Sequence, residues 1–189
     1  MLTLKNVAIT ILLFLAIALT SWSIIISNFT QATVVQDDPR KPDSFMIGVV
    51  ATNLNKNGLP ALKLITPKMT HYPENNTTDI TTPRVTIYRK SPNPWFIDSD
   101  FAKAKNGIDE IIFWSNVIIH HPADIDNPNT SLQTETLTIF PEQQIASTDE
   151  PVLFKQPSTT IHAIGMLANL DAGTIKLLSQ TQGEYVPSS

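Results

Sequence analysis

Prolines recur throughout the middle of this 189-residue chain, and their spacing limits the secondary structure that the chain can form. Thirteen of the fourteen prolines lie between residues 39 and 157, about one in every ten residues. Because proline breaks the interior of a helix, few helices of ordinary length fit between them. Short runs of alternating apolar and polar residues do fit, and this alternation is typical of strands. The runs are ALKLIT, RVTIY, IDEIIFW, NVIIHH, ETLTIF, PVLFK and TIKLL.

The strand pattern has one ambiguous segment and one regularity. Residues 99–107, SDFAKAKNG, suit a short helix, but their Ala-Lys-Ala-Lys alternation suits a strand equally well. The apolar runs recur, since Val85, Val117, Val152 and Tyr185 are separated by 32, 35 and 33 residues. A period of this length with about three strands per unit indicates a solenoid-like or jelly-roll body, with an immunoglobulin-like sandwich as the alternative.

An uncharged apolar run precedes the proline-rich region. Residues 7–26 read VAITILLFLAIALTSWSIII and contain no charged side chain. Twenty residues in a helix span about 30 Å, which is the thickness of a membrane's hydrocarbon core. Lys5 precedes the run, whereas Asp37 and Asp38 follow it, so the positive-inside rule predicts a cytoplasmic N-terminus. The alternative is a signal peptide cleaved at the small residues Ala16-Ile17-Ala18.

These patterns predict three parts. Residues 1–27 are expected to form a retained single-pass transmembrane anchor, 28–44 a linker, and 45–186 a β domain beyond the membrane. Hydroxyl side chains in the anchor either bond back to the carbonyls of their own helix or face other membrane helices. The residues expected to face other helices are Thr10, Thr20 and Ser21.

Composition and missing motifs exclude several functional classes. Charged residues make up only 16% of the chain and its net charge is −4, so it lacks the basic surface of a nucleic-acid-binding protein. The chain has no cysteine, which excludes disulfides, a thiol nucleophile and a cysteine-ligated metal. It has no P-loop, no nucleophile elbow and no dinucleotide-binding fingerprint, and no cofactor is expected.

Two groups of polar residues are candidates for chemistry. Asp98 and Asp100 would share one face of a strand, where paired carboxylates serve acid–base catalysis, although a solvated strand face is the simpler interpretation. One candidate function is therefore a membrane-tethered β-solenoid enzyme that acts on polysaccharide through this pair, as the alternative to a protein without enzymatic activity. His120, His121, Asp124 and Asp126 are metal-ligand types, but adjacent strand residues point to opposite faces and prolines flank the loop, so a metal site is not expected.

The last part of the chain, residues 165–185, reads GMLANLDAGTIKLLSQTQGEY and predicts a hairpin. Alternating apolar residues flank the small-residue turn Asp171-Ala172-Gly173. Only three of its residues are charged, whereas exposed edge strands are normally protected by charges, prolines or bulges. The terminal unit of a stacked body normally needs a cap, so this open edge is expected to continue into another β protein.

Three long segments carry a family resemblance: PWFIDSDFAKAKNGIDEIIFWSNVIIHH, LQTETLTIFPEQQIASTDEPVLF and IGMLANLDAGTIKLLSQTQGEY. The middle segment has the pattern L-x-T-x-x-L-x-x-x-P followed by A-x-T-x-x-P-V. Through these segments, residues 7–186 resemble the LptC family, the bitopic component of the bacterial lipopolysaccharide exporter. The bridge protein LptA shares the same repeat, and the retained N-terminal helix is what favours LptC.

The resemblance implies an all-β fold: a twisted, open antiparallel β-jellyroll, or β-taco, of solenoid-like repeats after a single transmembrane helix. It implies a protein that is not an enzyme and that transfers lipopolysaccharide from an inner-membrane ABC transporter to LptA. The N-terminal helix and the jellyroll would contact the transporter's membrane subunits LptF and LptG. The N-terminus would then be cytoplasmic, and the jellyroll would be periplasmic.

The resemblance also implies roles for residues of the jellyroll. By default the alternating apolar stripes are core, but in this family an open interior also holds acyl chains. Matching segments put Ile80 and Ile175 at lipid-contacting positions and Tyr185 toward LptA. The residues expected to bind lipid are Ile80, Val85, Val117, Ile139, Val152, Ile175 and Leu177. The residues expected to dock LptA along the C-terminal edge are Leu178, Thr181 and Tyr185.

Overall fold

A computed structural model describes residues 41–89, 92–125 and 127–186 of the chain. The expected anchor, including Thr10, Thr20 and Ser21, lies outside the described residues. Among the described residues, no helix has the length and apolar character needed to cross a membrane. These residues form an all-β unit, in agreement with the fold class expected from the proline spacing and alternation.

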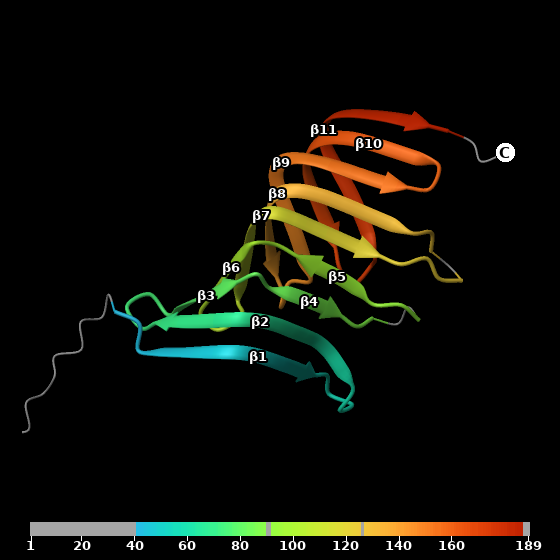
Figure 1. Cartoon of the computed structure of the whole chain (residues 1–189). Helices are drawn as coiled ribbons and strands as arrows, with labels where there is room; N and C mark the ends of the chain where they lie inside the picture. Colours follow the sequence, from blue (N-terminus) through green and yellow to red (C-terminus); the bar gives the residue numbers. More distant parts are fainter. Residues whose placement is uncertain (1–40, 90–91, 126, 187–189) are drawn as a thin grey trace, which may run out of the picture. The chain divides into compact units, whose positions relative to one another are not determined.

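The described part of the chain forms one antiparallel sheet of eleven strands (Figure 1). Consecutive strands pair in nearly every case, so the chain runs back and forth along the sheet from β1 to β11. The strands are β1 (Ser44–Leu54), β2 (Pro60–Tyr72), β3 (Thr77–Thr81), β4 (Arg84–Ile87), β5 (Trp95–Asp98), β6 (Phe101–Lys105), β7 (Glu110–His121), β8 (Thr130–Phe140), β9 (Ile145–Gln156), β10 (Thr159–Asn169) and β11 (Thr174–Tyr185).

The short strands show how the sheet folds over on itself. β3 and β4 both pair with β2, and β5 and β6 both pair with β7, so each short pair is one strand broken by a bend. Long strands run through the same bend without ending. The bend divides the sheet into two arms, which we call the β3/β6 arm and the β4/β5 arm after the short strands that each contains.

Local backbone geometry produces the bend. Thr82 between β3 and β4, and Ser115 and Asn116 inside β7, have φ values of 41°, 63° and 56°. Gly165 in β10 and Gln180 in β11 follow with φ of 78° and 47°. Such left-handed residues bulge a strand and turn its course, and register shifts interrupt β7 and β10 at these positions. A register shift between β8 and β9 lies between the bulges of β7 and β10, so these irregular positions follow one another across the sheet and their kinks add into one corner.

The bend explains why the strands exceed the lengths expected from the sequence. IDEIIFW and NVIIHH were expected as separate runs, yet the EIIFW part of the first run and the whole second run belong to the 12-residue β7. One repeat therefore contains two bent strands rather than three straight ones. Val117 and Val152 are equivalent, since both pair with Thr134, and Val85 belongs to a neighbouring row with Ile97.

Residues 99–107, the ambiguous segment, contain the strand β6. It pairs with β3 on one side and β7 on the other. Alternate positions in it, Ala102 and Ala104, are buried in the core. Small side chains fit here because the sheet curves tightly over its interior. Pairing with strands on both sides therefore makes this segment a strand. Local sequence propensity does not contain that information.

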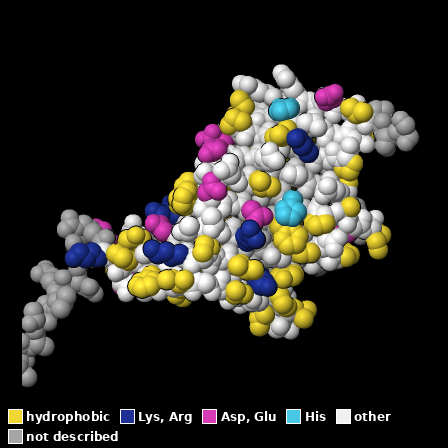
Figure 2. Space-filling model, viewed as in Figure 1, with side chains coloured by type: hydrophobic (Ala, Val, Ile, Leu, Met, Phe, Trp, Pro, Cys, Tyr) yellow, Lys and Arg dark blue, Asp and Glu magenta, His cyan; other side chains and the backbone are white. Residues whose placement is uncertain are grey.

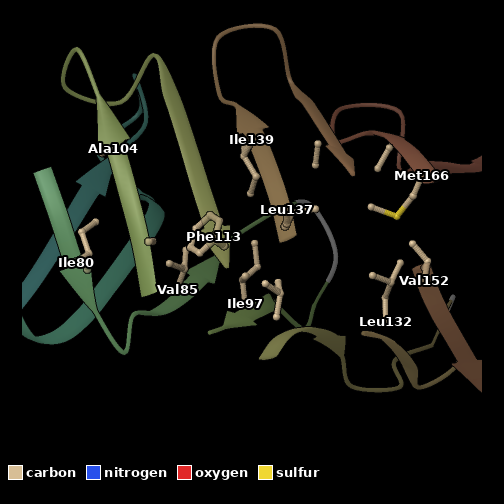
Figure 3. Packing of buried hydrophobic residues seen from close by; sticks show 14 residues of the cluster. Ile80, Val85, Ile97, Ala104, Phe113, Leu132, Leu137, Ile139, Val152 and Met166 are labelled. Carbon is tan, nitrogen blue, oxygen red and sulfur yellow. The ribbon is translucent and has the colours of Figure 1, made fainter. Parts of the chain in front are cut away.

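The core lies between the two arms. Figure 3 shows Leu137 and Ile139 of β8 on one side of it and Ile97 and Leu132 on the other. Leu137 is fully buried. The buried cluster comprises Ile80, Val85, Ile97, Ala102, Ala104, Phe113, Val117, Leu132, Leu137, Ile139, Ala146, Val152, Met166 and Ala168.

Candidate functional site: an apolar slot between the arms

Two cavities lie between the arms. The first, which we call the N-terminal chamber, has a volume of about 560 Å³ and is lined from β1 to β8. The second, the C-terminal chamber, has a smaller volume of about 90 Å³ and is lined from β4 to β11. The two chambers share the residues Ile87, Arg89, Ile139 and Leu170, so they form one slot that runs along the sheet.

The slot has an apolar lining because of the alternation in the strands. Leu62, Leu64 and Met69 of β2 contribute to the N-terminal chamber. Trp95 and Met166 contribute to the C-terminal chamber. These side chains only partly fill the space between the arms, in contrast with an ordinary close-packed core. An apolar slot of this kind accepts hydrocarbon chains, since their transfer from water is favourable at about 25 cal/mol for each Å² buried.

Four of the seven residues expected to bind lipid line this slot. Ile80 and Val85 line the N-terminal chamber, Ile175 lines the C-terminal chamber, and Ile139 lines both. Ile80, Val85 and Ile139 are each 6% exposed, whereas Ile175, at the sheet's edge, is 37% exposed.

The other three expected lipid residues pack elsewhere in the interior. Val117 and Val152 are buried in the core cluster beside the bend, and Leu177 packs against that cluster. None of these three is among the residues that line the two chambers. Val117 and Val152 both pair with Thr134, where the register shifts at the bend.

The slot also contains residues that sequence reasoning did not assign to it. Phe113 and Met166 are nearly fully buried at its walls. Met166 belongs to an alternating run that was expected only to form a strand. The alternation of that run could have indicated that Met166 faces the slot. Arg89 lines both chambers, and its guanidinium Nη1 donates a 3.2 Å hydrogen bond to Gln144 Oε1. Nothing in the sequence distinguishes Arg89 from other basic residues.

The candidate catalytic carboxylates lie at the bend. Asp98 ends β5, and its Oδ1 lies 3.8 Å from Arg84 Nε. Asp100 Oδ2 accepts hydrogen bonds of 2.7 Å from both Ser115 Oγ and Asn116 Nδ2. The bonds from Ser115 and then Asn116 hold the pKa of Asp100 below its ordinary value. An ionised Asp100 therefore ties β6 to the bulge of β7, which is a structural use of this carboxylate.

The two histidines considered as metal ligands have separate surroundings. The ring of His120 stacks on Phe96 at a centroid distance of 4.7 Å. His121 is buried, with its ring 4.8 Å from that of Trp95 and its Nε2 3.5 Å from Asp124 Oδ2. Within residues 41–89, 92–125 and 127–186, no three metal-ligating side chains gather into a site.

Both ends of the sheet are open edges. Among the strands of residues 41–89, 92–125 and 127–186, β1 pairs only with β2, and β11 pairs only with β10. Figure 2 shows hydrophobic side chains gathered where β1 and β2 lie in Figure 1, and Phe45 and Ile47 are 68% and 74% exposed. Tyr185 of β11 is 70% exposed. Each edge presents backbone groups that another strand would satisfy.

The free hydrogen-bonding groups of β11 follow from one observed bond. Val186 N–H donates to Ser158 O at 3.0 Å, so its amide faces β10. Amide direction alternates along a strand, and the pairing is regular from Gln182 to Tyr185. The N–H groups of Gly183 and Tyr185 therefore face outward. Of the expected docking residues, Leu178 and Thr181 lie beside the register shift, and Tyr185 lies on the regular part of the edge.

The chain matches one protein family and is similar to a solved structure. The family model described as lipopolysaccharide-assembly, LptC-related, matches residues 11–186. No curated protein sequence matches the chain significantly. The crystal structure of LptH, the LptA homologous periplasmic component of the conserved lipopolysaccharide transport device from Pseudomonas aeruginosa, is similar to it with a TM-score of 0.44 and 9% sequence identity. That similarity covers 78% of this chain and 96% of LptH.

Proposed function

Since the chain belongs to the LptC-related family of lipopolysaccharide-assembly proteins, we propose that it receives lipopolysaccharide from an inner-membrane ABC transporter and passes it to LptA. Family membership makes it a component of lipopolysaccharide transport. The proposal adds a direction to that role and names the neighbour on each side. It also gives the protein a position in the inner membrane, with the anchor at residues 1–27, a linker at 28–44 and a periplasmic jellyroll at 45–186.

One observation carries the proposal: the apolar slot runs from the N-terminal chamber, which β1 lines in part, to the C-terminal chamber, which β11 lines in part. A lipid that slides along it keeps its acyl chains out of water at each step. Because apolar side chains line both chambers, the acyl chains remain in an apolar environment along the whole path. Sugars and charged groups remain outside, on the open side between the arms.

The two open edges support the two hand-over points. A strand of LptA that pairs with β11 extends the same sheet, and therefore the same slot, beyond this chain. Outward N–H groups at Gly183 and Tyr185 supply affinity for that strand. At the other end, β1 follows the linker in the sequence, and its edge is offered to the transporter's membrane subunits LptF and LptG. The anchor, through Thr10, Thr20 and Ser21, contacts helices of those subunits.

Site-specific photocrosslinking tests the lipid path. A photoreactive side chain at Ile80, Ile139 or Ile175 is expected to capture lipopolysaccharide, because all three positions line the slot. The matched control is Lys56, which is exposed in the turn after β1. We expect strong crosslinks at the three slot positions and little at Lys56. Equal yields at all four positions would contradict an interior route.

A further inference from the structure

Arg89 has an unusual place at the slot. It follows β4, at the outer end of the β4/β5 arm, and it lines both chambers at the point where they meet. Its hydrogen-bond partner Gln144 precedes β9, at the outer end of the β3/β6 arm. The 3.2 Å bond between them therefore joins the two arms across the open side of the slot.

The hydrogen-bond partner of Arg89 is neutral, whereas three other basic residues of the described chain lie beside carboxylates. Arg84 lies 3.8 Å from the carboxylate of Asp98, and Lys105 lies 3.0 Å from that of Glu110. Lys103 likewise lies 3.3 Å from Asp79, its neighbour on β3. Among the ion pairs of the described residues, none involves Arg89. Within the part of the chain that the structure describes, no carboxylate therefore neutralises its charge at the lip of the apolar slot.

Gln144 is held in place by its own backbone. It adopts a φ of 58° in the turn between β8 and β9, and its N–H donates to Pro141 O at 3.2 Å. Its carbonyl accepts a 2.7 Å hydrogen bond from Leu170 N–H. The side-chain amide thus starts from a fixed point, and it keeps Arg89 extended over the slot when nothing else binds the guanidinium.

We propose that Arg89 binds a phosphate on the headgroup of an amphipathic lipid whose acyl chains occupy the slot. This inference rests on the proposed function, because it needs a lipid in the chambers. A guanidinium pairs with phosphate through two parallel N–H···O bonds, which are charge-assisted and stronger than a bond to an amide. The phosphate therefore displaces Gln144 from Arg89 and opens the link between the arms. Arg89 is then a binding site for each lipid headgroup as the lipid moves from one chamber to the other.

Binding of two matched lipids to the full chain in detergent tests this role. The probes are radiolabelled lipid A with its phosphates and the same lipid A after enzymatic dephosphorylation. The variants are Arg89→Gln, Arg89→Lys and Gln144→Ala. The control is Arg84→Gln, which removes a charge from a residue that is 80% exposed and lines neither chamber.

We expect Arg89→Gln to weaken binding of the phosphorylated lipid about tenfold, the size of one lost charge-assisted bond. Binding of the dephosphorylated lipid should change by less than about twofold, which also shows that the variant is folded. Arg89→Lys should recover part of the loss, since it keeps the charge without the planar fork. Gln144→Ala should bind the phosphorylated lipid at least as tightly as the parent, and Arg84→Gln should match the parent with both lipids.

The outcomes separate this inference from the function on which it rests. If the parent binds neither lipid, the proposed function fails. If the parent binds both lipids but Arg89→Gln weakens both equally, or neither, only the phosphate role of Arg89 is overturned. Inorganic phosphate is the third probe. Saturable phosphate binding that is lost in Arg89→Gln and abolishes lipid binding would assign the site to the free ion, and would overturn the headgroup role.

Discussion

A Cβ atom added to Gly165 of β10 would lie 3.0 Å from Leu178 Cδ1 of β11. Gly165 also has a φ of 78°, where residues with side chains are strained. The contact forms where the last hairpin passes through the bend. Gly165 therefore allows β10 to turn and lets Leu178 lie over it.

Gly165→Ala is expected to lower the free energy of unfolding by about 2 kcal/mol, through backbone strain and overpacking together. Urea denaturation measures this loss. The matched control is Gly58→Ala, because Gly58 has a φ of 76° but no atom within 4 Å of an added Cβ. The control should lose only about 1 kcal/mol. Combining Gly165→Ala with Leu178→Ala should remove the overpacking and leave the strain; an equal loss at both glycines would refute the contact.

The open edge of β11 is tested by a proline that leaves the internal ladder intact. Gly183 directs its N–H outward, so Gly183→Pro removes one donor that LptA would use. Gly183→Ala keeps that donor, and its added Cβ would make an ordinary 3.7 Å contact with Ile161. We expect the proline variant to bind purified LptA at least about tenfold more weakly than the alanine variant. Equal LptA affinity for the two variants would show that this edge is not the docking surface.

His71 and Asp43 clip the start of β1 in a pH-dependent way. Protonated His71 donates from Nδ1 to Asp43 Oδ1 at 2.8 Å and from Nε2 to Asn76 Oδ1 at 3.2 Å. The hydrogen bond to Asp43, and then that to Asn76, raises the pKa of His71 above 6.5. The bond from His71 lowers the pKa of Asp43 below 3.8.

The stabilisation from His71 is complete below pH 6.5 and is lost as the pH rises through its raised pKa. That from Asp43 is present above pH 3.8 and is lost as the pH falls through its lowered pKa. The clip is therefore strongest between these values. Hydrogen exchange at the N-terminal end of β1 should be slower, relative to intrinsic rates, at pH 5.5 than at pH 8, and Asp43→Asn should abolish the difference. An NMR titration that put the pKa of His71 at or below 6.5 would contradict the clip.

Asp100 supports the bulge of β7, and its carboxyl group is predicted to stabilise the fold fully only in the ionised form. Its lowered pKa means that its stabilisation is present above pH 3.8 and is lost as the pH falls through the lowered pKa. Asp100→Asn should therefore melt below the parent at pH 7, with a gap that closes toward pH 2. Thermal unfolding followed by circular dichroism measures both. Asp98→Asn is the control and should change less, because the Arg84–Asp98 pair is exposed. If the difference in melting temperature between Asp100→Asn and the parent did not change with pH, the effect would come from the shape of the side chain and not from its charge.

The sequence by itself determined the type of structure and the sides of the strands. Between residues 39 and 157, proline spacing excluded long helices, and alternation at Val85, Val117 and Val152 placed these side chains in the interior, where they are buried. The terminal hairpin was also predicted, with its turn between Asn169 and Thr174. These features depend on local rules of backbone geometry and on a side-chain period of two, so a single strand carries the whole signal.

Only the tertiary structure decided where the strands bend and which residues meet across the slot. EIIFW of the first expected run and NVIIHH of the next are continuous in β7, because the bulge at Ser115 and Asn116 bends the strand without ending it. Arg89 and Gln144 are 55 residues apart, and they meet because the fold-over brings the outer ends of the two arms together. Register and bending are sums over many strand pairs, and no local stretch of sequence encodes such a sum.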